Sequence, residues 1–162
     1  MGSLWRDSVH GALCRESGDD ASEATRATAL LLGIDPLRAS ALVRSLSPLA
    51  RTRLASDLAH ALEMARELQP DLIIAGADVG GSEVGVALRA FEADLQLQEI
   101  PVIVLASSDD DSTRISAMRG GALAWLPHTA DTEALLARVR LAVRMRRNTL
   151  LRAVAPRVSA RS

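Results

Sequence analysis

The sequence predicts an α/β protein built on a five-stranded parallel sheet that is doubly wound, with helices on both faces. Apolar runs of strand length alternate five times with segments of helical periodicity between residues 26 and 147. The first run, residues 29–34, is apolar throughout, which is typical of strands covered on both faces. Strands that alternate with helices at this spacing form parallel sheets, in which functional groups gather at the carboxyl ends of the strands.

Each element is expected from its own pattern. Apolar runs predict strands at residues 29–34, 72–75, 100–105 and 122–126, and a poorly marked second strand is expected near residues 52–55. Helical spacing of apolar residues predicts helices at 37–49, 57–68, 82–92, 113–118 and from 132 to at least 147, extending as far as 154. Residues 78–81 are expected to be flexible, and Asp131 is expected to cap the last helix by accepting from its first free N–H groups.

The two ends of the chain stand apart from this pattern. Residues 1–25 are expected to be a leader or linker, in which Ser17 to Ser22 are polar and the preceding apolar residues can share one face of a short helix. Residues 148–162 are expected to be a helical extension followed by a frayed basic tail. The apolar residues of the leader are Leu4, Trp5, Val9, Ala12 and Leu13.

Composition and charge narrow the function classes. The single cysteine of the 162 residues excludes an intrachain disulfide scaffold, and the chain shows neither a membrane-spanning run nor a signal peptide, so a cytoplasmic protein is expected. The net charge is −1, but residues 134–162 carry eight arginines and no acid. This basic end is either a solvated helix face or a surface for nucleic acid, a nucleotide phosphate or an acidic partner.

Two stretches resemble the receiver domain of bacterial two-component response regulators. Residues 100–140, "IPVIVLASSDDDSTRISAMRGGALAWLPHTADTEALLARVR", are similar to the family's sequence from its fourth strand to its last helix, and "QPDLIIAGA" is similar to its third strand. The resemblance covers residues 28–147 and implies a flavodoxin-like (βα)5 fold. It also implies signalling by exchange of protein partners.

The same resemblance implies that the phosphorylation chemistry is missing. The pair of metal-binding acids falls on Gly33 and Ile34, the acceptor aspartate on Gly76, the switch hydroxyl on Ala106 and the lysine on His128. Because Mg²⁺ requires oxygen ligands, no metal, cofactor or catalysis is expected. Trp125 takes the family's aromatic switch position and is expected to be a fixed core or interface residue.

Other polar residues leave alternatives open. Asp78, two residues past the acceptor position, is a candidate surrogate acceptor. Asp109, Asp110 and Asp111 form either a solvated loop or a weak cation site. Ser107 and His128 are a candidate hydrolytic pair, but such a pair needs an orienting acid and an oxyanion site as well.

The function expected from these observations is that of a phosphorylation-independent receiver-like adaptor. It is expected to bind itself or another signalling protein through the fourth helix, fifth strand and fifth helix, with Trp125 at the contact and Arg138 and Arg140 facing Asp109, Asp110 and Asp111. The last helix is similar to that of the second receiver of PleD-type diguanylate cyclases, which implies a cyclase output domain as a partner. Nucleic-acid binding through the arginines is the alternative, disfavoured because few aromatic residues are available for stacking.

Overall fold

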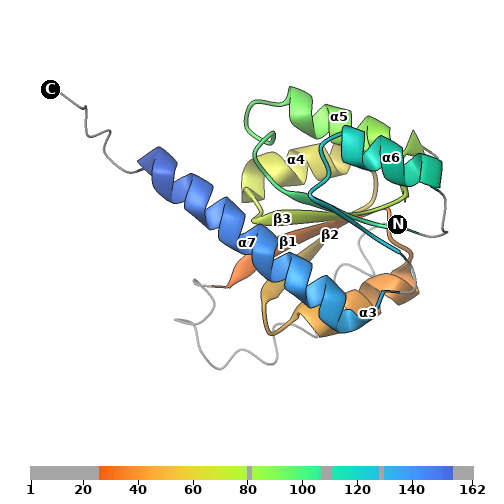
Figure 1. Ribbon diagram of the computed structural model, residues 1–162. Helices are drawn as coiled ribbons and strands as arrows, with labels where there is room; N and C mark the ends of the chain where they lie inside the picture. The colour runs from red at the N-terminus through yellow and green to blue at the C-terminus, as the bar shows by residue number, and fades with distance from the viewer. Residues whose placement is uncertain (1–25, 80–81, 107–110, 128–129, 155–162) are drawn as a thin grey trace, which may run out of the picture.

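The computed structural model describes residues 26–79, 82–106, 111–127 and 130–154, and its centre is a five-stranded parallel sheet (Figure 1). The strand order is β2-β1-β3-β6-β7, the flavodoxin-like arrangement. This confirms the predicted fold class. The strands are β1 (Ala27–Leu32), β2 (Ala50–Ala55), β3 (Leu72–Gly76), β6 (Val102–Leu105) and β7 (Ala124–Leu126).

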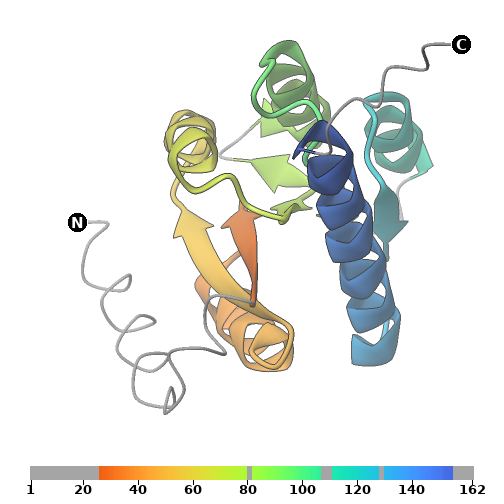
Figure 2. The ribbon, with the colours of Figure 1, turned by 90° about the vertical axis from the view of Figure 1, so that its left-hand side faces the viewer.

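Helices cover both faces of this sheet, as Figures 1 and 2 show from two directions. One apolar cluster joins the sheet to α3 and α7, and a second joins it to α4, α5 and α6. β1, buried except at Thr28, and β3, buried throughout, supply side chains to both clusters, which is why these strands are apolar on both faces. The helices are α3 (Pro36–Leu46), α4 (Leu58–Leu68), α5 (Val84–Ala93), α6 (Asp111–Arg119) and α7 (Thr132–Val154).

Aspartates begin three of the helices. The carboxylate of Asp35 accepts from the backbone N–H of Arg38 at 2.9 Å and so caps α3. Asp57 caps α4 in the same way, and Asp131 accepts from the N–H of Ala134 at 2.8 Å. The predicted cap of the last helix is therefore confirmed, because in each case a side-chain oxygen satisfies a donor that has no partner within the helix.

The structure corrects several local predictions. Residues 78–81, expected to be flexible, begin with the short strand β4 (Asp78–Val79). This strand pairs antiparallel with β5 (Ser82–Glu83), where the next helix was expected to begin, because Asp78 pairs with Glu83 and Val79 with Ser82. Asp111 belongs to the first turn of α6 and not to the preceding loop. Boundaries elsewhere differ by a few residues.

The last helix is longer than the sheet requires. α7 has 23 residues, and its C-terminal turns run past the edge of the sheet (Figure 1). The boundary expected between residues 147 and 148 therefore lies inside a continuous helix. None of the helices among the described residues is long and apolar enough to cross a membrane.

Candidate functional site

A cleft of about 600 Å³ opens at the carboxyl ends of β1, β2 and β3. It is lined by the loop between β1 and α3, by the end of β2 and by the residues that follow β3. Three positions singled out from the sequence, Gly33, Ile34 and Gly76, line this cleft. Ala106 directly follows β6 and is fully buried. The structure thus brings four of the five expected receiver positions to one edge of the sheet.

The two glycines of the cleft are packed backbone against backbone. A Cβ added at Gly76 would come closer than 3.0 Å to the carbonyl oxygen of Gly33. A Cβ added at Gly33 would lie 2.6 Å from the carbonyl oxygen of Asp78. Gly33 also has a φ of 66°, a left-handed conformation that favours glycine. In this backbone conformation, neither position has room for a side chain.

The residues of the cleft do not fit a magnesium ion. Mg²⁺ requires near-octahedral oxygen ligands and is usually held by carboxylates. The acids that line the cleft are Asp35, one oxygen of which caps α3, and Asp78. Among the residues that the structure describes, no group of three or more His, Cys, Asp or Glu side chains is arranged to hold a metal.

Arg38, a residue that was not singled out from the sequence, brings a positive charge to the cleft from the first turn of α3. Its Nη1 donates to the carbonyl oxygen of Ala106 at 3.2 Å, which ties the first turn of α3 to the end of β6. Of the described residues that line the cleft, Arg38 is the one cation. Its position in the sequence could have identified Arg38 as a cleft residue, because the first turn of the helix after β1 lies at the carboxyl edge of a parallel sheet.

Asp78 lies at the rim of the cleft, where the surrogate-acceptor hypothesis needs it. Its backbone is held by pairing with Glu83, and its carbonyl oxygen contacts Gly33. The side chain is exposed. The position permits contact with a phosphodonor, but it lacks the acid pair and the lysine that the resemblance associates with phosphorylation.

A serine and a histidine that were not singled out from the sequence meet at the start of α4. Ser56 Oγ lies 3.1 Å from His60 Nδ1 and 3.2 Å from Asp57 Oδ2. The other oxygen of Asp57 accepts from the backbone N–H of His60, and this bond is the main reason that the pKa of Asp57 is held below its usual value. The carboxylate of Asp57 bonds to Ser56 Oγ and to the backbone N–H of His60, so this group is arranged as the cap of α4.

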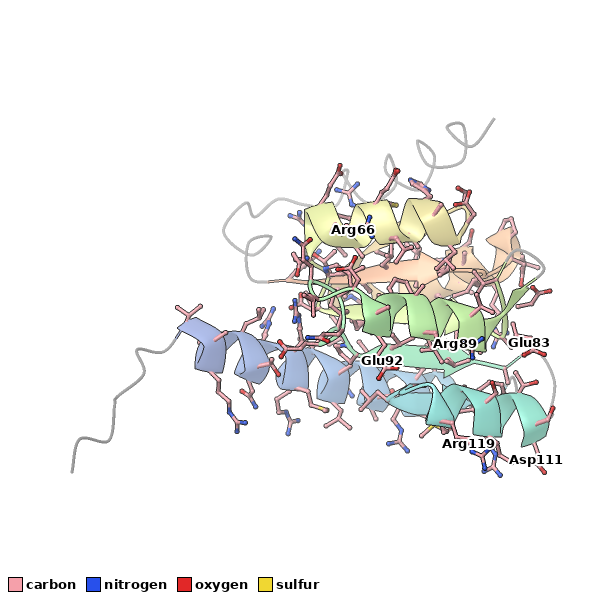
Figure 3. The ribbon with its side chains drawn as sticks, turned by 90° about the horizontal axis from the view of Figure 1, so that it is seen from above. Arg66, Glu83, Arg89, Glu92, Asp111 and Arg119 are labelled. Atoms are coloured by element: carbon pink, nitrogen blue, oxygen red, sulfur yellow. The ribbon has the colours of Figure 1, made fainter. Side chains whose placement is uncertain are left out.

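The predicted interface residues are spread over the edge of the sheet. β7 is an edge strand flanked by α6 and α7, and Trp125 on it is half-buried against the α4–α6 cluster. Asp111 Oδ1 lies 3.3 Å from Arg114 Nη2, an exposed ion pair within α6. Figure 3 shows Asp111 and Arg119 on α6, which lies beside α5. Ser107, Asp109, Asp110 and His128 lie outside the described residues.

Arg138 and Arg140 are both exposed, but they lie on different sides of α7. Residues two positions apart on a helix point about 160° away from each other at 3.6 residues per turn. Arg140 lines a groove with Leu49, on the side of α7 that faces α3, so Arg138 lies on the opposite flank. The two arginines therefore do not belong to a single patch.

Part of the chain is similar in sequence to a known response regulator. Response regulator MprA of Mycobacterium leprae is 35% identical over 94 residues, which are 56% of this chain and 39% of that protein. The chain thus spans about two fifths of the length of this curated relative. No protein-family model matches the chain.

Solved receiver structures share the fold. The receiver domain of an HD domain-containing protein from Pseudomonas fluorescens has a TM-score of 0.71 and 22% identity and covers 78% of this chain and 93% of that one. The chain has the fold of a response-regulator receiver domain. CheY4 of Vibrio cholerae (TM-score 0.65, 19% identity, 73% and 99% covered) and the BeF3-activated receiver of Klebsiella pneumoniae RstA (TM-score 0.65, 22% identity, 72% and 98% covered) are further examples.

Proposed function

We propose that this receiver-like domain is an adaptor that signals by protein–protein contact without being phosphorylated. The observation that supports this most directly is the packing of Gly76 against the Gly33 carbonyl. A receiver's acceptor carboxylate would have to extend from a position at which no Cβ fits. Besides lacking a carboxylate, Gly76 lacks the space for one.

The adaptor needs a surface that binds its partner. We propose the edge formed by α6, β7 and α7, which are the fourth helix, the fifth strand of the main sheet and the fifth helix in chain order. Exposed apolar side chains lie on this edge, including Ile115 and Met118, which are each 47% exposed on α6. Arg114 and Arg119 line a shallow hollow with them. Apolar side chains bordered by charges are typical of a contact surface for another protein.

The end of α7 is a second contact in the same proposal. Leu151 and Val154 are 69% and 82% exposed in the turns that run past the sheet. A helix that carries apolar residues beyond its own domain can dock on a following or separate domain. We propose a signalling output domain as that partner, for which the PleD-type resemblance of the last helix suggests a diguanylate cyclase, in cis or in trans.

Phosphorylation tests the central claim. Acetyl phosphate or beryllofluoride with Mg²⁺ is expected to leave the backbone NMR spectrum of the protein unchanged, because neither an acceptor nor a metal site is expected. A histidine kinase with its phosphodonor is likewise expected to transfer no phosphate to the protein.

The opposite outcome has a defined signature. Acid-stable, base-labile phosphate bound in stoichiometric amount, and lost in Asp78→Asn, would replace the proposal with a surrogate-acceptor receiver. Asp71→Asn is the matched control, because Asp71 lies at the other end of β3, where its carboxylate accepts from the backbone N–H of Thr28.

A further inference from the structure

The helix layer formed by α3 and α7 is strongly basic. These two helices contain eight arginines and a single acid, Glu133, which gives a net charge of +7. The opposite layer of α4, α5 and α6 contains four arginines and four acids, a net charge of zero. Because α3 and α7 cover the same face of the sheet (Figure 1), positive charge is concentrated on that face.

A groove on this face combines the charge with apolar surface. The α7 groove, as we call it, has a volume of about 360 Å³ and lies between α7 and Leu49, the residue before β2. Three of its arginines follow one another at the spacing of one helix row, where like charges repel. Such a groove suits an acidic amphipathic segment. Its lining is Leu49, Val139, Arg140, Val143, Arg144, Arg147 and Asn148.

Residues 1–25 have the complementary chemistry. They contain five acids and two arginines, a net charge of −3, together with the apolar positions that can share one helix face. This segment lies outside the described residues. Its acids are Asp7, Glu16, Asp19, Asp20 and Glu23.

The chain enters the fold beside the groove. Ala27, the first residue of β1, pairs with Ala50, which directly follows Leu49. Ala27 and Val139 belong to one apolar cluster, against which Leu49 and Val143 pack. A segment tethered this close reaches the groove easily, and a short flexible tether gives an effective concentration in the mM range.

We propose that residues 1–25 dock in cis on the α7 groove, with the apolar face of the segment against Leu49 and Val143 and its acids near Arg140, Arg144 and Arg147. Docking neutralises the row of like charges and shields the basic face from other polyanions. The inference goes beyond the proposed function, because it concerns the side of α7 that faces α3, whereas the proposed partner surfaces are the β7 side and the last turns of α7.

The single cysteine provides the test. A nitroxide attached to Cys14 of the 162-residue chain is expected to remove most of the intensity of the backbone amide signals of residues 139–148. The signals of α5, on the opposite layer, are expected to stay intact. Arg140→Glu/Arg144→Glu is expected to restore the lost signals. The control Arg89→Glu/Arg119→Glu makes the same charge change on α5 and α6 (Figure 3) and is expected to restore nothing.

Three outcomes would overturn the proposal. Equal signal loss over the whole protein, or none, would mean that the segment has no fixed place. Signal loss in a mixture of nitroxide-labelled and isotope-labelled copies would mean that a second copy fills the groove. The third outcome has two parts: residues 1–25 do not dock, and duplex DNA shifts the signals of residues 139–148 in a strongly salt-dependent way. That result would assign the groove to nucleic acid.

Discussion

The carbonyl oxygen of Gly33 occupies the space into which a side chain at Gly76 would extend. This contact makes the two glycines interdependent: the loop after β1 can lie on the end of β3 only while both lack a Cβ. The absence of a carboxylate at Gly76 is therefore built into the backbone path. Restoring the aspartate alone would disrupt the cleft before it created an acceptor.

Gly76→Ala is expected to destabilise the protein by about 1–3 kcal/mol, the usual cost of forcing an extra methyl group into a packed site. Gly33→Ala is expected to cost at least as much, because it adds a left-handed φ to a 2.6 Å clash with Asp78. Urea denaturation followed by circular dichroism measures both.

Gly121→Ala is a control variant that introduces backbone strain without a steric clash. Gly121 has a φ of 94°, but a Cβ there would meet nothing within 4 Å. Gly121→Ala is expected to lower the free energy of unfolding by about 1–2 kcal/mol, through the unfavourable backbone conformation alone. If Gly76→Ala proved neutral while Gly121→Ala was destabilising, the cleft backbone would be able to move, and the steric argument against an acceptor at position 76 would fail.

The sequence showed the missing groups of the cleft but not what replaces them. Gly33, Ile34, Gly76 and Ala106 could be placed from their positions at strand ends. The hydrogen bond from Arg38 to the Ala106 carbonyl could not be predicted from the sequence, because it depends on the direction in which α3 leaves the sheet. The contact between two backbone segments likewise leaves no pattern in the sequence.

At the scale of elements, α4 and α5 are joined by one ion pair. Arg66 Nε, in the last turn of α4, donates to Asp94 Oδ2 at 2.7 Å just after α5 ends. This hydrogen bond is the main reason that the pKa of Asp94 lies below its usual value. A carboxyl with a depressed pKa in the folded state stabilises the fold above its unfolded pKa, near 3.8, and this contribution is lost as the pH falls through the folded pKa.

Asp94→Asn is therefore expected to reduce stability at neutral pH and to flatten the loss of stability in acid. Urea unfolding between about pH 2 and pH 7 measures the difference from the unmodified protein, which is expected to vanish at the acid end. Glu92→Gln, on α5 itself, is the control for a lost negative charge (Figure 3). A difference that stayed constant with pH would show that the ion pair is not responsible.

A second element, the extension of α7, is fixed by a buried arginine. Arg146 is 3% exposed, donates from Nη2 to Gln69 Oε1 at 3.1 Å, and has no partner at Nε among the described residues. The carbonyl end of α4 lies next to Gln69, so the helix dipole favours a cation there. Gln69 itself has a φ of 46°, a conformation that asparagine tolerates well.

Gln69→Asn is expected to destabilise the protein by about 1–3 kcal/mol, although asparagine suits the backbone, because its shorter side chain leaves Arg146 buried without an acceptor. Arg146→Met removes the buried charge and keeps an unbranched apolar side chain in its place, so it is expected to be neutral or stabilising. Thermal unfolding and amide exchange in the last turns of α7 report both effects. A stabilised Gln69→Asn protein would contradict this account.

The elements show which sequence signals were sufficient. Apolar runs and helical spacing placed four strands of the main sheet and each helix to within a few residues, whereas β2 was only poorly marked. β4 was mistaken for part of a flexible stretch and β5 for the start of a helix, although Gly80-Gly81 between two short segments is a recognised two-residue hairpin signal. Its strands of two residues are too short to show an alternating pattern.

For the whole molecule, charge becomes interpretable only once the topology is known. The sequence displayed a basic C-terminal segment, but it could not show that α3, about one hundred residues earlier, shares its face. Likewise, it grouped Arg138 with Arg140, whereas helix geometry assigns them to opposite flanks of α7. Each flank can therefore be tested separately.

Self-association is expected to use the flank that faces β7. In a two-fold contact, the exposed Ile115 and Met118 of α6 would supply most of the affinity, while Arg138 would pair with acids of the other copy and set the register. An exposed ion pair contributes about 0.2–1 kcal/mol and occurs twice in such a dimer, so Arg138→Glu is expected to weaken it between about 2-fold and 30-fold.

The two flanks give this prediction its control. Arg140→Glu makes the same change on the α3 side and is expected to leave the dissociation constant unaltered, whereas Ile115→Asp is expected to abolish the dimer with the fold intact. Light scattering across a concentration series measures all three. Because a specific interface must bury about 1,000 Å² or more, apolar contacts on α6 and not arginine pairs have to dominate it. A protein that remained monomeric at high concentration would remove self-association from the proposal and leave a different partner protein for the β7 edge.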